Sequence, residues 1–237
     1  MKRKIGIAIA AVFYAGVALA QKPVASFPFE QFGDHSFIKV KVNNSEELDF
    51  IFDTGDGLTV LNIDRAKELG MTSGANATTT SAEGTISGKL VKHNELTVGG
   101  APVHNIKVYE TSLNHLEISI GRNIDGIIGY DILNNYVVSM NFDTKMIELY
   151  NPKNYKYNGS GKMMSINLTS FIPHIAGQVT LSNGEQLKGE FFIDTGAKAT
   201  VDFNTPFVEL NDLASKIGDS YIYLVAGLGD TEYETHR

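Results

Sequence analysis

The sequence contains no cysteine among its 237 residues. This absence excludes disulfide-stapled scaffolds, thiolate metal sites, iron–sulfur clusters and cysteine nucleophiles. Positive charge is also scarce, because 20 Lys and Arg stand against 27 Asp and Glu, which gives a formal net charge of −7. Removal of Lys2, Arg3 and Lys4 with a leader would take the net charge to −10. Neither nucleic acid nor an anionic membrane is therefore expected as the main partner.

Motifs for metal or phosphate chemistry are missing as well. The six histidines include no His-Glu-x-x-His pair, and we expect all of them at the surface. The segment from Asp53 to Gly57 lacks the alternating acidic ligands and the terminal Glu of a calcium loop. No Gly-Lys-Ser/Thr phosphate loop and no Gly-x-Ser-x-Gly elbow occurs. We expect no metal and no other cofactor.

Long apolar runs are absent after the first twenty residues. There, Lys2-Arg3-Lys4 precede an apolar run from Ile5 to about Val17, and Ala18-Leu19-Ala20 fits the small-x-small cleavage rule. This pattern predicts a signal peptide over residues 1–20. The run is shorter than the roughly 20 residues that span a bilayer, so a retained anchor is the weaker alternative. We expect an exported protein, periplasmic or secreted, that leaves the membrane after cleavage.

The full sequence has a globular composition, 43% hydrophobic and 20% charged, and after residue 20 its apolar residues fall in short strand-like runs. Residues 37–42 and 48–52 alternate partly around an Asn-Asn-Ser turn, which predicts a β-hairpin. Further strands are expected at residues 89–98, 106–109, 136–142 and 146–150. Two short helices are predicted, one from Ile63 to Leu69 with Asn62 as its N-cap, and one from Pro206 to about Ile217. The predicted fold class is all-β with short helices.

A repeated hexapeptide divides the chain. Phe50-Ile51-Phe52-Asp53-Thr54-Gly55 recurs 141 residues later as Phe191-Phe192-Ile193-Asp194-Thr195-Gly196. Each copy places one carboxylate at the end of a buried apolar strand, where an unpaired charge is costly. A two-fold arrangement of two lobes would bring Asp53 and Asp194 together. The expected organisation after the signal peptide is a first lobe at residues 21–151, a linker at 152–161 and a second lobe at 162–237.

The two Asp-Thr-Gly triplets, together with the segment from Asp125 to Leu133, resemble the aspartic protease superfamily of pepsin and the retroviral proteases. The resemblance covers residues 26–237 and is to two retropepsin-like halves fused in one chain. Bacterial exported aspartyl proteases, which often carry a C-terminal PDZ domain, have this form. The resemblance implies a two-lobed acid-protease fold and an endopeptidase that hydrolyses peptide bonds of an extended polypeptide.

The resemblance also implies the site. Asp53 and Asp194 would form the catalytic dyad. Two carboxylates about 3 Å apart share one proton, so one acts as base on a bound water while the other hydrogen-bonds the peptide carbonyl. The other implied residues are the active-site loop support (Thr54, Gly55, Thr195, Gly196), the substrate-binding flap (Gly84, Thr85, Ile86) and the element packed beneath the catalytic loop (Ile127, Ile128, Gly129).

The residues after each triplet depart from the family pattern. Asp56-Gly57 and Ala197-Lys198 stand where family members commonly have Ala or Ser followed by Ser, Thr, Asn or Asp. Two interpretations of the charges on Asp56 and Lys198 stay open. Each is either a solvated loop edge or a group that shifts the pKa of the dyad.

The second half of the chain is also short. Gly55 and Gly129 are 74 residues apart, whereas only 41 separate Gly196 from Arg237, and no second apolar-apolar-Gly element follows. We therefore expect an incomplete second lobe, and a chain that is poorly active or inactive as a fragment of a longer protease. Two alternatives of another class are a non-catalytic peptide-binding module on the same fold and a glycosidase with carboxylates 5 Å or more apart.

Overall fold

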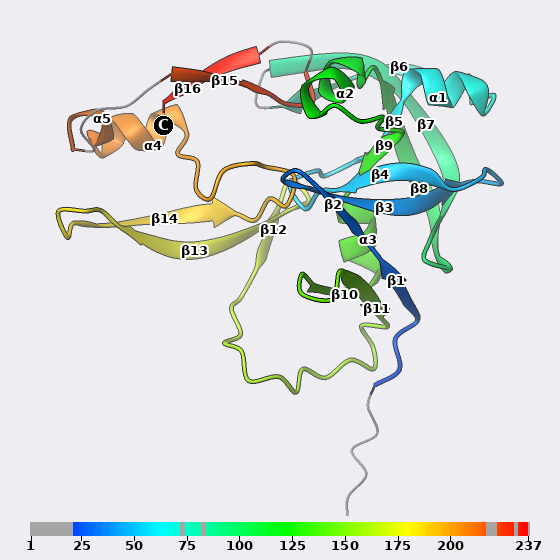
Figure 1. Cartoon of the computed structure of the whole chain (residues 1–237), viewed down its shortest axis with the longest axis horizontal. Helices are drawn as coiled ribbons and strands as arrows, with labels where there is room; N and C mark the ends of the chain where they lie inside the picture. Colours follow the sequence, from blue (N-terminus) through cyan, green and yellow to red (C-terminus); the bar gives the residue numbers. More distant parts are fainter. Residues whose placement is uncertain (1–20, 72–73, 82–83, 217–221, 230–231, 237) are drawn as a thin grey trace, which may run out of the picture.

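The computed structural model describes residues 21–71, 74–81, 84–216, 222–229 and 232–236. The predicted signal peptide at residues 1–20 lies outside these ranges. Strands dominate the described chain and the helices are short, so the all-β prediction is confirmed (Figure 1). None of the helices in the described ranges is long and apolar enough to cross a membrane.

The first lobe is built on an eight-stranded sheet in the order β2-β3-β4-β9-β5-β8-β7-β6, with a further pairing of β3 to β7 that folds the sheet back on itself. The predicted hairpin is present, with Phe37 opposite Ile51. The other predicted strands of this region lie inside β7 and β8, which are longer than expected. The strand bounds are β2 Glu30–Phe32, β3 His35–Val42, β4 Leu48–Phe52, β5 Thr59–Asn62, β6 Ala75–Ser81, β7 Gly84–Val98, β8 Ala101–Thr111 and β9 Gly126–Ile128.

A smaller three-stranded sheet closes one end of this lobe. Its strands are β1 (Ala25–Pro28), β10 (Val137–Asn141) and β11 (Met146–Tyr150), with β11 in the middle. β10 and β11 form the hairpin that the turn at residues 143–145 predicts. β1, which the sequence pattern did not predict, pairs with the far edge of β11. The main core lies between the two sheets and includes Val40, Phe50, Leu61, Val98, Val108, Ile147 and Leu149.

Three helices belong to the first lobe, α1 (Ile63–Glu68), α2 (Asn114–Ile120) and α3 (Tyr130–Asn135). α1 begins where predicted, because the Asn62 side chain accepts a hydrogen bond from the Asp64 N–H. α2 ends at Gly121, whose φ of 79° lies in the left-handed region that suits glycine. α2 and α3 were not predicted.

The predicted helix from Pro206 to Ile217 is wrong as one element. The structure has α4 (Thr205–Leu210) and α5 (Leu213–Lys216), and residue 217 lies outside the described ranges. Asp212 interrupts the helix with a φ of 49°, and its carbonyl and carboxylate both accept a hydrogen bond from the Ser215 hydroxyl. Asp competes for local hydrogen bonds and tolerates the left-handed region, which explains the break.

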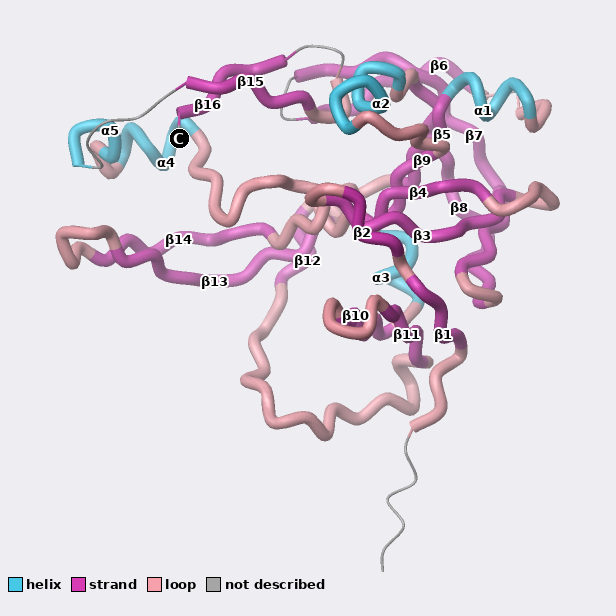
Figure 2. The backbone as a smooth tube through the Cα atoms, in the orientation of Figure 1, coloured by secondary structure: helices cyan, strands magenta, loops and turns pink. Residues whose placement is uncertain are grey.

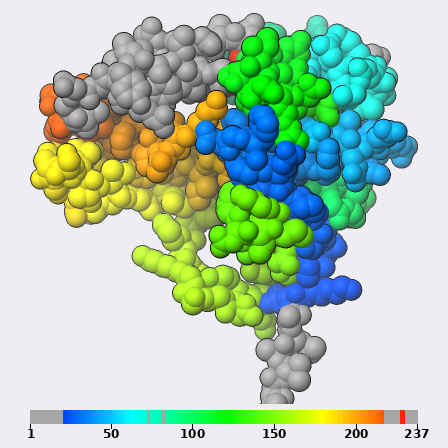
Figure 3. All heavy atoms as spheres, in the orientation of Figure 1, coloured from blue at the N-terminus to red at the C-terminus, as the bar shows by residue number. Residues whose placement is uncertain are grey.

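In the described ranges, the sheets of the second lobe are smaller than the main sheet of the first. β12 (Asn167–Thr169), β13 (Ile172–Thr180) and β14 (Gln186–Phe192) form a separate sheet, and β15 (Ile222–Ala226) pairs with β16 (Glu232–His236). Residues 151–166, which include the predicted linker, contain no helix or strand and form a long loop (Figures 1, 2 and 3). Two hydrogen bonds between Lys156 and Gln21 hold the first part of this loop to the first lobe. Large apolar side chains exposed in this half include Met163, Met164, Ile166, Leu168, Phe192 and Val201.

Candidate active site

The two Asp-Thr-Gly triplets lie near the ends of two strands that belong to different sheets. Asp53 follows β4, and Asp194 follows β14 after one intervening residue. In each loop the aspartate caps its own turn: the Gly55 N–H donates to Asp53 Oδ1 at 2.7 Å, and the Gly196 N–H donates to Asp194 Oδ1 at 2.7 Å. The same local hydrogen bond therefore forms twice, as the repeat in the sequence suggests.

The two threonines join the loops by four crossed hydrogen bonds. The Thr54 N–H donates to Thr195 Oγ1 and the Thr195 N–H donates to Thr54 Oγ1, both at 3.1 Å. The Thr54 hydroxyl donates to the Ile193 carbonyl at 2.7 Å, and the Thr195 hydroxyl donates to the Phe52 carbonyl at 2.9 Å. Ile193 and Phe52 are equivalent positions of the repeat, so the contact between the lobes is nearly two-fold symmetric.

The crossed threonines bring the two carboxyl groups together at the glycines. A β carbon on Gly55 would lie 2.6 Å from Asp194 Cγ, and one on Gly196 would collide with the Asp53 carboxyl. Burial raises the pKa of Asp53 well above its ordinary value, and the nearby charges of Asp194 and Asp56 and a hydrogen bond with Asp194 add to the rise. Close carboxyl groups with one raised pKa behave as a coupled pair that holds a shared proton.

The segment Ile127-Ile128-Gly129 lies against the first loop. β9 runs parallel to β4, with Ile127 beside Ile51 and Ile128 beside Phe52, and the Asp53 N–H donates to the Ile128 carbonyl at 3.0 Å. A β carbon on Gly129 would collide with the Asp53 carbonyl. This element therefore fixes the backbone at Asp53 from below.

Asp56 is not at a solvated loop edge. Its side chain is partly buried, and Oδ1 accepts a hydrogen bond from the Leu58 N–H at 3.0 Å. Burial raises its pKa to about 7, and the charges of Asp131 and Asp194 act in the same direction. Lys198, by contrast, is exposed. Of the two open interpretations, burial beside the dyad fits Asp56, and a solvated edge fits Lys198.

Gly57 has a packing role that the sequence did not reveal. A β carbon there would lie 2.9 Å from the Ser170 carbonyl oxygen and 3.4 Å from Phe171 Cβ, in the turn between β12 and β13. The Phe171 ring also packs on Tyr130, with 4.8 Å between ring centroids. The second lobe thus occupies the space that a side chain after the first triplet would need.

His35, the first residue of β3, lies near the second Asp-Thr-Gly loop. Only 8% of the residue is exposed, so its predicted surface position is wrong, and neither ring nitrogen has a hydrogen-bond partner among the described residues. Burial and the charge of Lys198 lower its pKa, while Asp34 and Asp194 oppose that shift; the Gly196 backbone is close but outside good hydrogen-bond geometry. The first lobe thus reaches the second Asp-Thr-Gly loop through His35. His35 belongs to no motif in the sequence, so the sequence gave no signal that it would be buried at this loop.

The predicted flap residues form part of a hairpin. Gly84, Thr85 and Ile86 begin β7 and lie opposite Ser81, Thr80 and Thr79 of β6, while residues 82–83 lie outside the described ranges. The Tyr109 hydroxyl of β8 donates to the Ile86 carbonyl at 2.8 Å. A hairpin therefore stands where the flap was expected, and its contact with substrate stays a prediction.

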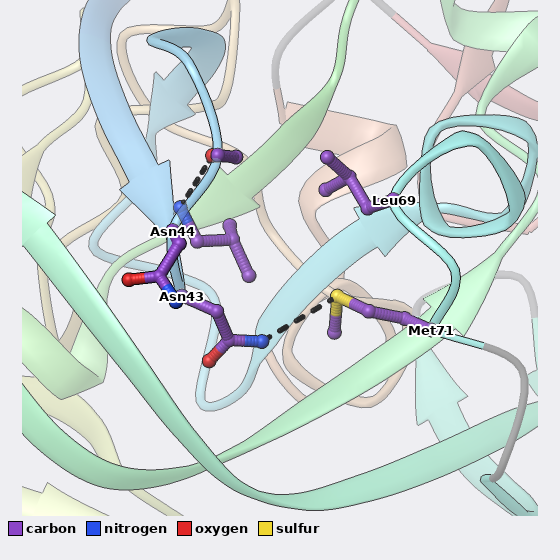
Figure 4. A pocket seen from close by; sticks show the side chains of 6 residues that line it. Asn43, Asn44, Leu69 and Met71 are labelled. Atoms are coloured by element: carbon purple, nitrogen blue, oxygen red, sulfur yellow. Dashed lines mark hydrogen bonds between the residues drawn. The ribbon is translucent and has the colours of Figure 1, made fainter.

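Other features offer little chemistry. Within the described ranges, no group of three or more His, Asp or Glu side chains is placed to hold a metal ion. A pocket of about 280 Å³ contains no titratable side chain, and in it the Asn43 amide points toward the Met71 sulfur (Figure 4). Its lining is Val42, Asn43, Asn44, Ser45, Leu69 and Met71.

Comparison with known proteins connects this geometry to a family. Residues 38–132 match the family model described as aspartyl protease. The resemblance to the aspartic protease superfamily is therefore confirmed for this segment. The matched segment contains the first triplet, the β6–β7 hairpin and the Ile-Ile-Gly element, and it stops before the second triplet.

Comparison with solved structures gives a match of low overall similarity. A crystal structure of a retropepsin-like aspartic protease from Rickettsia conorii is 20% identical to the chain, with a TM-score of 0.40. That alignment covers 53% of this chain and 91% of the Rickettsia chain. A search of curated proteins found no match.

Proposed function

We propose that this chain is an exported aspartic endopeptidase, periplasmic or secreted, in which Asp53 and Asp194 activate a water for attack on a peptide bond. The observation that carries the proposal is the threonine-linked pair of loops, which presents two close carboxyl groups with a raised pKa on Asp53. With one shared proton, the ionised carboxylate takes a proton from water, and the protonated one donates to the carbonyl oxygen of the substrate.

The proposed substrate is an extended polypeptide lying between the loops and the β6–β7 hairpin. Main-chain hydrogen bonds would hold it in this position, and side-chain pockets would set sequence preference. In this proposal residues 1–20 are the export signal, residues 21–151 and 162–237 the two lobes, and residues 152–161 their linker.

Cleavage of an unfolded protein between pH 3 and 8 tests the proposal. The chain and its Asp53→Asn and Asp194→Asn variants should be compared, with and without a pepstatin-type inhibitor. Inhibitor-sensitive cleavage that both substitutions abolish is the expected result. If every chain is folded and none cleaves, the enzyme proposal fails.

One observation favours a second candidate, a non-catalytic peptide-binding module. The first loop is held by β9, whereas β14 pairs only with β13 among the strands of the described ranges. Phe192 and Ile193, next to Asp194, are 56% and 38% exposed. A peptide that binds the folded chain without being cut, with equal affinity for the Asp53→Asn variant, would support this candidate.

A further inference from the structure

The backbone of Asp56 is fixed between the dyad and α3. Its N–H donates to the Asp53 carbonyl at 3.2 Å, and its own carbonyl accepts from the Tyr130 N–H at 3.1 Å. The side chain turns back to the Leu58 N–H. The backbone of Asp56 is therefore fixed, and movement of its side chain into solvent would break the hydrogen bond from Leu58.

The charged groups that act on Asp56 are carboxylates from three elements. Asp53 belongs to its own loop, Asp194 to the second catalytic loop and Asp131 to α3. Asp131 is itself partly buried, with a raised pKa, and accepts a hydrogen bond from the Thr59 hydroxyl at 2.6 Å. Such a cluster holds protons to higher pH than isolated carboxylates do, because each new negative charge opposes the next.

A histidine lies on the other side of the dyad. His35 is near Asp194, and Lys198 and Asp34 are the other charged groups that act on His35. The surroundings of the two catalytic aspartates therefore differ, with a carboxyl group next to Asp53 and a buried histidine next to Asp194.

The hydrogen bonds show the same asymmetry. Asp194 Oδ1 accepts two backbone N–H groups, from Gly196 at 2.7 Å and Ala197 at 3.0 Å. Asp53 Oδ1 accepts only the Gly55 N–H, because the Asp56 N–H donates to the backbone carbonyl of Asp53 instead. N–H donors stabilise a carboxylate more than a carboxylic acid, so Asp53, which has one donor fewer, is the member of the pair better suited to hold the proton.

We propose that Asp56 is a positioning residue that keeps the shared proton of the dyad on Asp53 into the neutral pH range. When Asp56 ionises, its proton leaves to solvent, and the charge that remains opposes loss of the proton held by Asp53. The second ionisation of the dyad is thereby delayed, and the singly ionised form persists to higher pH. This inference rests on the proposed function of Asp53 and Asp194 as a catalytic pair.

Two substitutions remove the charge with little change of shape. Asp56→Asn retains the oxygen that accepts from Leu58, and Asp56→Ala reproduces the Ala197 that the second loop already contains. The matched control is Asp143→Asn, which removes one carboxylate from an exposed turn. The measurement is the titration of the Asp53 carboxyl by ¹³C NMR in the folded full chain, assigned with Asp53→Asn.

We expect both Asp56 variants to lower the pH at which Asp53 loses its proton by about 1 unit, and Asp143→Asn to leave it unchanged. In an active form of the protein, the alkaline limb of kcat/KM against pH should move down with it. The acid limb should stay, because Asp56 is already protonated there.

An unshifted Asp53 titration in two folded Asp56 variants would overturn the inference. This result is distinguishable from failure of the proposed function, because the NMR titration needs no cleavage. A shifted titration in a chain that never cleaves would uphold the role of Asp56 and reject the protease.

Discussion

A methyl group on Gly129 would meet the Asp53 carbonyl and come within 2.8 Å of the Asp56 carbonyl oxygen. Neither backbone atom can move without disturbing the first Asp-Thr-Gly loop, so we expect Gly129→Ala to lower the free energy of unfolding by about 3 kcal/mol or more. Urea unfolding at constant pH measures the change. Gly70→Ala is the control: its φ of 71° disfavours alanine but nothing lies within 4 Å, so it should cost about 1 kcal/mol. Equal losses in both variants would contradict the packing argument.

Asp56 should make the stability of the whole protein depend on pH. Its pKa is raised to about 7 in the folded state, whereas an unfolded aspartate titrates near 4, so the folded state binds more protons between these values. Stability contributed by protonated Asp56 is therefore complete below about pH 4 and is lost as the pH rises to about 7, by up to about 4 kcal/mol.

Urea unfolding from pH 4 to 8 tests this sign. The Asp56→Asn variant should lose less stability over that range than the wild-type chain, with the difference greatest at pH 8. Parallel curves for the two proteins would show that Asp56 does not carry the effect.

At the scale of elements, the β6–β7 hairpin depends on one buried tyrosine. The Tyr109 hydroxyl reaches the carbonyls of Ile86 at 2.8 Å and Ala77 at 3.3 Å, one in each strand. Tyr109→Phe should destabilise the chain by about 1 kcal/mol and speed amide hydrogen exchange in the hairpin. Tyr150→Phe, which loses a bond only to Glu148, should leave exchange in the hairpin unchanged. Uniform acceleration over the whole sheet would indicate a general loss of stability instead.

Elements with local signals were predictable from sequence. The β3–β4 hairpin and α1 follow from alternation, an Asn-containing turn and an N-cap. β1 was not predictable, because its partner β11 is more than a hundred residues away and pairing at that distance leaves no local pattern. For α2 a signal did exist: Leu113, Leu116 and Ile120 share a helical face before Gly121.

The residues of the candidate site also differ in whether the sequence could predict them. The repeat pointed to Asp53, Asp194 and their threonines because equal sequences make equal loops. His35 could not be predicted, because its burial arises only when the first lobe meets the Lys198 loop. The space beside Gly57 was likewise hidden, since the segment that fills it comes from the other lobe.

At the scale of the whole molecule, the crossed threonine hydrogen bonds join the two lobes, and substitution of Thr195 measures their contribution to stability. Thr195→Val keeps the shape of the side chain but leaves the Phe52 carbonyl and the Thr54 N–H without this partner. We expect a loss of about 2–3 kcal/mol in the free energy of unfolding and faster exchange of the Thr54 amide. Thr195→Ser retains the hydroxyl and should restore most of both. If Val and Ser behave alike, the hydroxyl is not what joins the lobes.

Each threonine bonds the hydroxyl of the other threonine and the carbonyl two residues before it, so the contact is isologous: one surface is complementary to a copy of itself. The first lobe already contains Phe52, Thr54 and the Asp53 carboxyl in the required arrangement. Two copies of that lobe, expressed alone, hold every hydrogen-bonding group needed to associate through this surface as a symmetric homodimer with one aspartate from each copy.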